Sequence, residues 1–322
     1  MKNDKLLMAQ VATLYYEKNL TQQEIANTMK LSRQTISKLL NEAVVEKIVE
    51  IKIHNPEEDK EELAKAIRSS FALSDIHIAT VSSDDTYLRQ LMTSKTAVDV
   101  ILPHLSQNKK IAISWGRTIQ TFIEELPHKD ASFSHSISAT ANASGNIVFP
   151  LFGATDRQKS YYLSNELARL FAEKIGARAE YAWFPYVTDN ASDYDLFKRT
   201  SYYKNMEENW NNIDIAIVGI GNRNALSQFE EAFGPNPEAT FDVGDIATHS
   251  FTVFGTISKQ RAHTLCVSEE ALKHAKKVFA IACGNDKTEA IVGALRTGLI
   301  TDLILDEYTA KSILEYLSQN NL

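Results

Sequence analysis

The chain has 322 residues, of which 44% are hydrophobic and 23% are charged, a balance typical of a globular protein with two unequal domains. No apolar run approaches the roughly 18 residues that a membrane span needs, and the polar start at Met1–Leu7 has no signal-peptide core, so we expect a cytoplasmic protein with no membrane partner. The two cysteines, Cys266 and Cys283, lie far apart in the sequence, so we expect no metal site, no disulfide framework and no cofactor.

Charge is unevenly distributed along the chain, whose net charge is −7. Residues 1–53 carry eight basic and six acidic side chains, so this segment is positive and the rest of the chain is acidic. Lys30, Arg33 and Lys38 lie in a stretch, residues 27–41, that has no acidic residue. Screening limits repulsion from distant acidic groups to about a Debye length of ~8–10 Å, so this local basic patch can still attract nucleic-acid phosphates.

Three helical patterns follow each other near the N-terminus, in the order that a helix-turn-helix requires. The first covers Lys5–Lys18. The second begins at a capping box, Thr21–Glu24, and the third begins after Ser32, a favourable N-cap. The apolar residues that these patterns turn inward are Leu7, Val11, Leu14 and Tyr15, then Ile25, Ala26 and Met29, then Ile36, Leu39, Leu40 and Ala43.

The outer face of the third helix has side chains of the kinds that read DNA. Arg33 can donate two bonds to guanine and Gln34 can pair with adenine, while Ser37 and Lys38 can contact phosphates or bases. The alternative is a three-helix packing or dimerisation module with a solvated polar face. We predict that double-stranded DNA is bound by Thr21, Gln22, Ser32, Arg33, Gln34, Thr35, Ser37 and Lys38.

Two further features bear on this motif. Lys30 stands where many such turns carry glycine, so either it accepts a left-handed backbone at a modest cost or the turn relaxes slightly. Lys47–Ile53 alternates apolar and charged residues, which predicts a strand and hence a winged helix-turn-helix.

A break at His54–Pro56 and a helix predicted at Glu57–Phe71 separate this region from a longer one. That helix could link the domains, contact a second subunit or pack on its own domain. We expect a DNA-binding domain at 1–54, a linker helix at 55–74 and an effector-binding domain at 75–322.

In the long region, short β-branched runs alternate with helical patterns. This alternation predicts an α/β fold with a doubly wound, Rossmann-like parallel sheet. The expected strands are Ile76–Val81, Lys110–Ser114, Ser136–Thr140, Glu180–Phe184, Asp214–Val218, Val278–Cys283 and Asp302–Leu305, and the expected helices include Tyr87–Leu105, Lys159–Ile175, Glu270–Lys276 and Asp286–Thr297.

Ligands of such sheets bind beyond the carboxyl ends of the strands, so the residues that follow the strands are candidate site residues. The segment 114–118, Ser-Trp-Gly-Arg-Thr, combines a glycine turn, a fixed positive charge and a helix start, which suits a phosphate. Gly219-Ile220-Gly221 and the segment 284–287, Gly-Asn-Asp-Lys, are two more glycine turns. Each alone could be a tight turn or a solvated surface residue, whereas the three together favour an anionic ligand. Asp245, beside Gly244, could bind sugar hydroxyls or end a helix.

The whole chain resembles the SorC/DeoR-type sugar-binding transcriptional regulators. The resemblance rests on residues 14–17, 21–26, 31–40 and 48–49 in the N-terminal part, and on 114–118, 214–221, 243–246, 287–295 and 306–307 in the C-terminal part. It implies a C-terminal domain related to sugar-phosphate isomerases that has lost catalysis, a phosphorylated sugar as effector, and a homodimer or homotetramer on a palindromic operator. By position, Gly116, Arg117, Thr118 and Lys287 would hold the phosphate, while Asn165 and Asp245 would face the sugar.

We therefore expect a regulator of carbohydrate metabolism that is not an enzyme and whose operator binding is controlled by a phosphorylated sugar. The alternative is a sugar-phosphate isomerase-like enzyme with a DNA-binding appendage, for which Asp242, Asp245 and Glu166 are candidate acid–base residues, although their spacing shows no nucleophile–base pair. The expected effector site comprises Ser114, Trp115, Gly116, Arg117, Thr118, Asn165, Gly219, Gly221, Asp245, Gly284 and Lys287.

Overall fold

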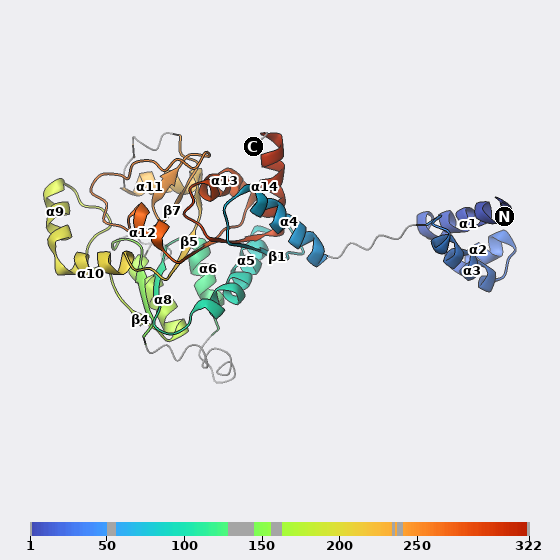
Figure 1. Cartoon of the computed structure of the whole chain (residues 1–322), viewed down its shortest axis with the longest axis horizontal. Coiled ribbons are helices and arrows are strands. Elements are labelled where there is room, and N and C mark those ends of the chain that lie inside the picture. Colours follow the sequence, from blue (N-terminus) through green and yellow to red (C-terminus); the bar gives the residue numbers. More distant parts are fainter. Residues whose placement is uncertain are drawn as a thin grey trace. The chain divides into compact units, whose positions relative to one another are not determined.

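The computed structural model describes residues 2–49, 56–127, 145–155, 163–233, 236 and 241–320. The chain divides into two compact units, Met1–Asp59 and Lys60–Leu322 (Figure 1). Each unit has a hydrophobic cluster of its own. The domain boundaries expected at residues 54 and 74 stay predictions. Among the described residues, no helix is long and apolar enough to cross a membrane.

The first unit contains the three predicted helices, α1 (Lys2–Ala12), α2 (Gln22–Met29) and α3 (Arg33–Val45), and α1 continues into a π-helical turn at Thr13–Glu17. The inward faces predicted for α2 and α3 are confirmed, except that Met29 is only half-buried. The buried cluster consists of Met8, Val11, Ala12, Ile25, Ala26, Ile36, Leu39, Leu40 and Ala43, with Leu7, Leu14 and Tyr15 packed against it. This packing determines which side of α3 remains available to a partner.

Local hydrogen bonds fix the two helix starts as predicted. The Thr21 N–H donates to the Glu24 carboxylate at 2.8 Å, and the Glu24 N–H donates back to the Thr21 hydroxyl at 3.3 Å, which completes the capping box. At the start of α3 the Ser32 hydroxyl accepts from the Thr35 N–H at 3.0 Å. Between the helices Lys30 is left-handed, with φ 53° and ψ 42°, so the backbone accepts the strain and the turn does not relax.

The strand predicted at Lys47–Ile53 is wrong for Lys47–Val49, which form a turn and a bend. The Ile48 and Val49 N–H groups both donate to the Ala43 carbonyl, at 2.8 and 3.0 Å. These bonds close the end of α3, and they use the donors that a β-ladder would need. Residues 50–53 lie outside the described part of the chain.

The second unit is built on a seven-stranded sheet in which every strand pair is parallel, with the order β1-β10-β9-β5-β2-β3-β4. The parallel α/β fold is therefore confirmed. The strands are β1 (Asp75–Ala79), β2 (Lys110–Ile113), β3 (Ile147–Pro150), β4 (Arg178–Ala179), β5 (Ile215–Gly219), β9 (Lys277–Ile281) and β10 (Asp302–Asp306). A smaller antiparallel sheet consists of β6 (Gly221–Asn222), β7 (Gly244–Ile246) and β8 (His249–Phe251).

Two strands differ from the sequence prediction, and one predicted strand is not tested. The segment Glu180–Phe184 is not a strand, because side-chain bonds take over from the ladder: the Asn165 amide accepts from the Ala182 N–H at 2.9 Å and donates to the Ala182 carbonyl at 3.2 Å. β3 was not expected from the sequence, since it is short and ends in Pro150. The predicted strand Ser136–Thr140 lies outside the described residues.

Right-handed crossovers place helices on both faces of this sheet. The connections β2–β3 and β3–β4 advance toward one edge, and β9–β10 advances toward the other, so α6 and α8 cover the face opposite to α13 (Figure 1). α6 contacts both α5 and α8, while α13 contacts α14. The helices of this unit are α4 (Pro56–Ser70), α5 (Thr86–Ile101), α6 (Arg117–Glu125), α8 (Ser164–Ile175), α9 (Ala191–Arg199), α10 (Ser201–Trp210), α11 (Arg223–Phe233), α12 (Glu269–His274), α13 (Thr288–Arg296) and α14 (Glu307–Gln319).

The helix expected at Glu57–Phe71 is present as α4. Its residues Leu63, Ala64 and Ile67 pack into the cluster of the second unit, and Ile67 is fully buried. Of the roles left open by the sequence, the structure shows this helix packed on its own domain.

The strand order reverses between the neighbouring strands β2 and β5. From β2 the chain continues to β3 on one side, and from β5 it continues to β9 on the other. In open α/β sheets such a reversal leaves a crevice at the carboxyl ends of the two strands, where ligands bind. The three glycine turns selected from the sequence follow β2, β5 and β9, which are adjacent in the sheet. The fold therefore brings these turns to one edge.

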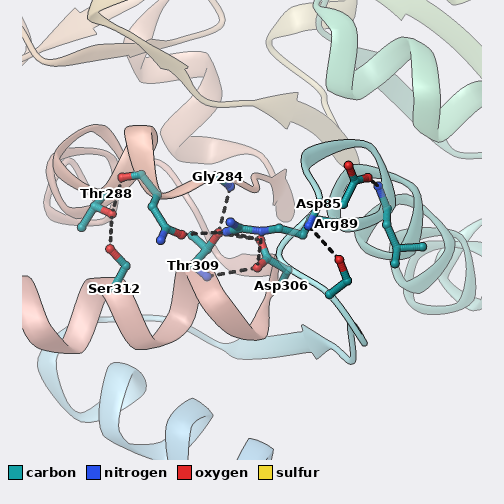
Figure 2. Close-up of polar contacts among 10 residues, drawn as sticks. Asp85, Arg89, Gly284, Thr288, Asp306, Thr309 and Ser312 are labelled. Atoms are coloured by element: carbon teal, nitrogen blue, oxygen red, sulfur yellow. Dashed lines mark hydrogen bonds and ion pairs between the residues drawn. The ribbon is translucent and has the colours of Figure 1, made fainter.

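A buried ion pair holds this edge together (Figure 2). Arg89, in the first turns of α5, donates through Nε to Asp306 at 3.0 Å and through Nη2 to the same carboxylate at 3.3 Å. The same Nη2 donates to Asn285 at 2.8 Å and to the Thr309 hydroxyl at 2.9 Å. The Thr309 hydroxyl also accepts from the Gly284 N–H at 2.9 Å. The ends of β9 and β10 are thus tied to α5 by one guanidinium group.

We expect Arg89→Met to lower the free energy of unfolding by about 3–5 kcal/mol, because it leaves the Asp306 carboxylate buried without a counter-charge. Asp306 is 0% exposed and Arg89 is 6% exposed, so water cannot substitute. Urea denaturation measures the loss. The matched control is Lys95→Met on the same helix, whose exposed ion pair with Glu125 spans 3.9 Å and should contribute less than about 1 kcal/mol. Equal losses for the two variants would contradict the interpretation.

We expect Lys30→Gly to stabilise the first unit by about 0.5–1 kcal/mol, because glycine adopts the left-handed backbone without steric cost. Hydrogen–deuterium exchange of the α2 and α3 amides in the full chain measures the local stability. Lys18→Gly is the control, since Lys18 ends the preceding helical segment with φ −95° and gains nothing from glycine. Faster exchange in the Lys30 variant would show that the strain assigned to this turn is absent.

Candidate functional sites

The outer face of α3 presents the side chains predicted to read DNA. Arg33, Gln34 and Lys38 are exposed and Ser37 is half-buried, whereas Ile36 is fully buried behind them. The geometry that a recognition helix needs is therefore present, since polar groups project from the side opposite to the core. Lys38 also lies 3.7 Å from Glu42, an exposed pair that a phosphate could replace.

The predicted residues Thr21, Ser32 and Thr35 act first as structural caps. The Thr21 hydroxyl is bonded to Glu24, and the Ser32 and Thr35 hydroxyls lie 2.7 Å apart. Gln22, the first residue of α2, is half-buried. These residues set the positions of the first turns of α2 and α3, where backbone N–H groups can face DNA phosphates.

Tyr15 packs against the hydrophobic cluster as predicted, whereas sequence reasoning did not single out its exposed neighbour Tyr16. Their rings meet edge to face with centroids 5.0 Å apart, and Tyr16 is 44% exposed. Both line a cleft of about 600 Å³ together with Gln22 and Arg33. A tyrosine hydroxyl beside an arginine is a common contact to the DNA backbone. The sequence signal was available only as two adjacent aromatic residues before the capping box.

At the sheet edge, the turn after β2 has a packed half and an open half. The Ser114 N–H donates to Ile217 of β5 at 2.9 Å, and the buried Trp115 ring packs on Phe152, with ring centroids 4.0 Å apart. Gly116 then turns with φ 118°, and a Cβ atom added there would meet no described atom within 4 Å. Ser114 and Trp115 therefore hold the turn in place, and no described residue packs against Gly116.

The helix that begins at this turn can receive an anion. α6 starts at Arg117 with no side-chain cap at Gly116, so its first N–H groups are left for another acceptor. Arg117 is exposed and Thr118 is buried at the same helix start. Within the described part of the chain, no carboxylate forms an ion pair with Arg117.

The turns after β5 and β9 add a second cation and a carboxylate. Lys287 donates to the Ile220 carbonyl at 3.0 Å, and burial lowers the pKa of its ammonium group, with nearby Arg117 lowering it further. The Asp245 carboxylate accepts from the Thr248 N–H at 3.3 Å, and burial raises its pKa to about 6. Lys287 acts on the pKa of Asp245 in the opposite direction, so the two groups lie near each other.

Position 221 must be glycine, because the Asp245 carboxylate occupies the space that a side chain would need. A Cβ atom added at Gly221 would fall 1.9 Å from the Asp245 Oδ1 atom. The two residues are direct partners in the β6–β7 ladder. Gly219 packs more loosely, with its added Cβ atom 3.8 Å from Ile119. Arg117, Lys287, Asp245 and Gly221 thus form one group, which we name the effector edge.

Two predicted effector residues are already engaged within the protein. The Asn165 amide is bonded at both ends to the Ala182 backbone, and the Gly284 N–H is bonded to Thr309. Their observed contacts are those of positioning residues. Sequence reasoning missed Arg89, and it missed Asn222, which donates to the Asp286 carboxylate at 2.8 Å and ties β6 to the turn after β9. These partners lie far apart in the sequence, so periodicity gives no signal for them.

Two of the three acid–base candidates of the enzyme alternative, Glu166 and Asp242, are engaged by neighbouring side chains. Glu166 forms an ion pair with Arg169 at 2.8 Å, whose hydrogen bonds lower its pKa. Asp242 is buried and accepts from the Ser258 hydroxyl at 2.7 Å. Among the described residues, no group of three or more His, Cys, Asp or Glu side chains could hold a metal ion. A cleft of about 380 Å³ beside Asn285 and Asp286 is lined by none of the predicted effector residues.

Comparisons with known proteins identify the family of the chain. Residues 55–315 match the family model described as "Putative sugar-binding domain", and residues 8–46 match the model of Sigma-70, region 4. The chain is 28% identical to the sorbitol operon regulator of Klebsiella pneumoniae, over 97% of this chain and 99% of that protein. It is 24% identical to the deoxyribonucleoside regulator of Bacillus subtilis, over 97% and 98% of the two chains.

The fold is also that of a solved regulator. The crystal structure of full-length SorC, the sorbitol operon regulator of Klebsiella pneumoniae, matches 97% of this chain and 99% of its own at 26% identity, with a TM-score of 0.70. The family model covers most of the chain, and the matching relatives carry both units. The chain therefore belongs to the sugar-binding-domain family of SorC-type transcriptional regulators, with a DNA-binding helix-turn-helix at its N-terminal end.

Proposed function

We propose that this regulator binds a phosphorylated sugar at the effector edge and that the bound sugar phosphate controls its affinity for operator DNA. The observation that supports the proposal is that Lys287 reaches the Ile220 carbonyl after β5, while Arg117 begins α6 after the neighbouring strand β2, at the point where the strand order reverses. Two like charges that lie close together repel each other, and a dianionic phosphate relieves that repulsion.

The two ends of the ligand would bind different groups. The phosphate would accept from the Arg117 and Lys287 side chains, from the Thr118 hydroxyl and from the first N–H groups of α6, with Gly116 leaving room for it. The sugar hydroxyls would donate to the Asp245 carboxylate. Ser114 and Trp115 would support this pocket, and Gly219 and Gly221 would leave it open because they have no side chain. Asn165 and Gly284 would hold the neighbouring segments in position.

The names of two relatives support a sugar-derived ligand. One regulates a sorbitol operon and the other is named for deoxyribonucleosides, which contain a sugar. For this chain we propose a role in carbohydrate metabolism, with binding rather than turnover. The contacts of Glu166 and Asp242 favour this view, because neither carboxylate is placed with a partner that would make an acid–base pair.

On the DNA side, we propose that a homodimer or homotetramer binds a palindromic operator through Arg33, Gln34, Ser37 and Lys38. Two recognition helices must then match half-sites about one helical turn, ~34 Å, apart or a multiple of it. The sugar phosphate would act by changing how the protomers present their helices. Cytoplasmic localisation stays a prediction.

We expect Arg33→Ala to weaken binding to the specific operator by about 1–3 kcal/mol and to leave nonspecific binding nearly unchanged. Lys38→Ala should weaken both kinds of binding and reduce the salt dependence by about one phosphate contact. Gel-shift titrations over a series of salt concentrations measure both effects. Lys5→Ala is the control, because Lys5 pairs with Glu46 and lies outside the predicted contacts. A normal operator affinity in the Arg33 variant would contradict the recognition-helix assignment.

We expect a panel of hexose, pentose and hexitol phosphates to contain a ligand that raises the Tm of the full chain, while the parent sugars do not. Lys287→Gln should then weaken its binding roughly tenfold to hundredfold, since a hydrogen bond to a charged group contributes about 1.5–3 kcal/mol. Calorimetric titration measures the affinity. Lys276→Gln is the control. This exposed lysine directly precedes β9, at the opposite end of the strands, and pairs with Asp214. A wild-type chain that binds no sugar phosphate, or that converts one to product, would overturn the proposal.

A further inference from the structure

A hairpin turn beside the effector edge has a backbone that its residue types do not favour. β7 and β8 are joined by two residues, Ala247 and Thr248, with Ile246 paired to His249. Both turn residues have positive φ, 47° and 72°. Two-residue hairpins with positive φ at both positions normally carry Asn-Gly or another glycine pair. A β-branched residue such as Thr248 in this region is a genuine outlier, so surrounding contacts must hold it there.

Contacts from outside the hairpin supply that constraint. The Gln260 side-chain amide donates to the Thr248 hydroxyl at 3.1 Å and lies 3.5 Å from the Thr248 carbonyl. The same amide nitrogen lies 3.1 Å from the Cys266 sulfur. The Gln260 carbonyl oxygen is buried, with no hydrogen-bond partner among the described residues. The Gln260 side chain therefore bonds to Thr248 through its amide nitrogen, while its carbonyl oxygen is left without a hydrogen bond from these residues.

The turn is linked directly to the effector edge. The Thr248 N–H donates to Asp245 Oδ2 at 3.3 Å, and the other oxygen of that carboxylate lies against Gly221. Both oxygens of Asp245 are thus placed by backbone, one by the strained turn and one by the close approach of β6. If Thr248 relaxed toward negative φ, its N–H would turn away and the carboxylate would lose this orientation.

We infer that Thr248 is a positioning residue, which is anchored by Gln260 and orients the Asp245 carboxylate toward the sugar hydroxyls of the ligand. The inference rests on the proposed function, because it assumes that Asp245 faces the sugar part of a sugar phosphate. It assigns Thr248 and Gln260 to selectivity for the sugar, while Arg117 and Lys287 serve the phosphate. The strained turn thus serves to orient the Asp245 carboxylate, and not to stabilise the fold.

The test compares two substitutions of the same residue in the full chain. Thr248→Val keeps the branched shape and removes the hydroxyl anchor, whereas Thr248→Ser keeps the hydroxyl. The probes are inorganic phosphate and the sugar phosphate of the panel that binds the wild-type chain most tightly, with affinities from calorimetric titration. We expect Thr248→Val to bind the sugar phosphate about tenfold more weakly and inorganic phosphate equally well, and Thr248→Ser to stay within about twofold of the wild type for both.

Further measurements separate positioning from a general structural role. Gln260→Leu, which removes the anchor from its other side, should reproduce the selective loss. Asn108→Gly is the control for a substitution at a left-handed residue away from the site, because Asn108 has φ 57° and precedes β2, at the opposite end of the strands. It should leave both affinities unchanged. Weakening of both probes alike by Thr248→Val, or of neither, would overturn the inference alone. A wild-type chain that binds no sugar phosphate would overturn the proposed function itself.

Discussion

Arg89 and Asp306 place opposite charges in a part of the protein where either alone would be costly by several kcal/mol. Their positions are acceptable because every strong bond that the carboxylate can accept is supplied, by Arg89 and by the backbone and hydroxyl of Thr309. The same hydroxyl holds the Gly284 N–H, so the turn after β9 takes its position from the ion pair. Lys287 follows in that turn and reaches the Ile220 carbonyl across it. The phosphate end of the proposed site therefore depends on a contact that no ligand touches.

The cations of this edge differ in what neutralises them. Arg89 is buried against a carboxylate, whereas Arg117 and Lys287 have no carboxylate within 4 Å among the described residues. Burial, and to a lesser extent the nearby Arg117, lowers the pKa of Lys287, so the charged form of this lysine carries a cost. Such a cost is understandable where an anionic ligand offsets it. The exposed ion pairs on the helices differ from the effector edge, because their cations are solvated and already paired with a nearby carboxylate.

The sequence was sufficient for features that depend on local pattern. The capping box at Thr21 and the inward face of α3 both follow from spacing within one or two helical turns, whereas the sequence left open whether Lys30 is left-handed or the turn relaxes. The three glycine turns were also found, because each follows a strand with a strong apolar pattern. The alternation at Lys47–Ile53 predicted a strand, but the described part of this run forms the turn that ends α3. Arg89 and Asn222 could not be found, because their partners lie 196 and 64 residues away and only the sheet order brings them together. Gln260 is nearer to Thr248 in the sequence, but it lies in an irregular segment whose pattern gives no signal for the contact.

Two left-handed residues in this chain show why backbone strain alone says little about function. Lys30 is exposed, and its own side chain holds no neighbouring group in place, so relief of its strain should affect only the stability of the turn. Thr248 has the same type of backbone but is held by Gln260, and its N–H is committed to the Asp245 carboxylate. A strained residue persists when its surroundings over-determine it. The difference between the two is therefore what the strained group orients, and of the two only Thr248 orients a carboxylate of the proposed effector site.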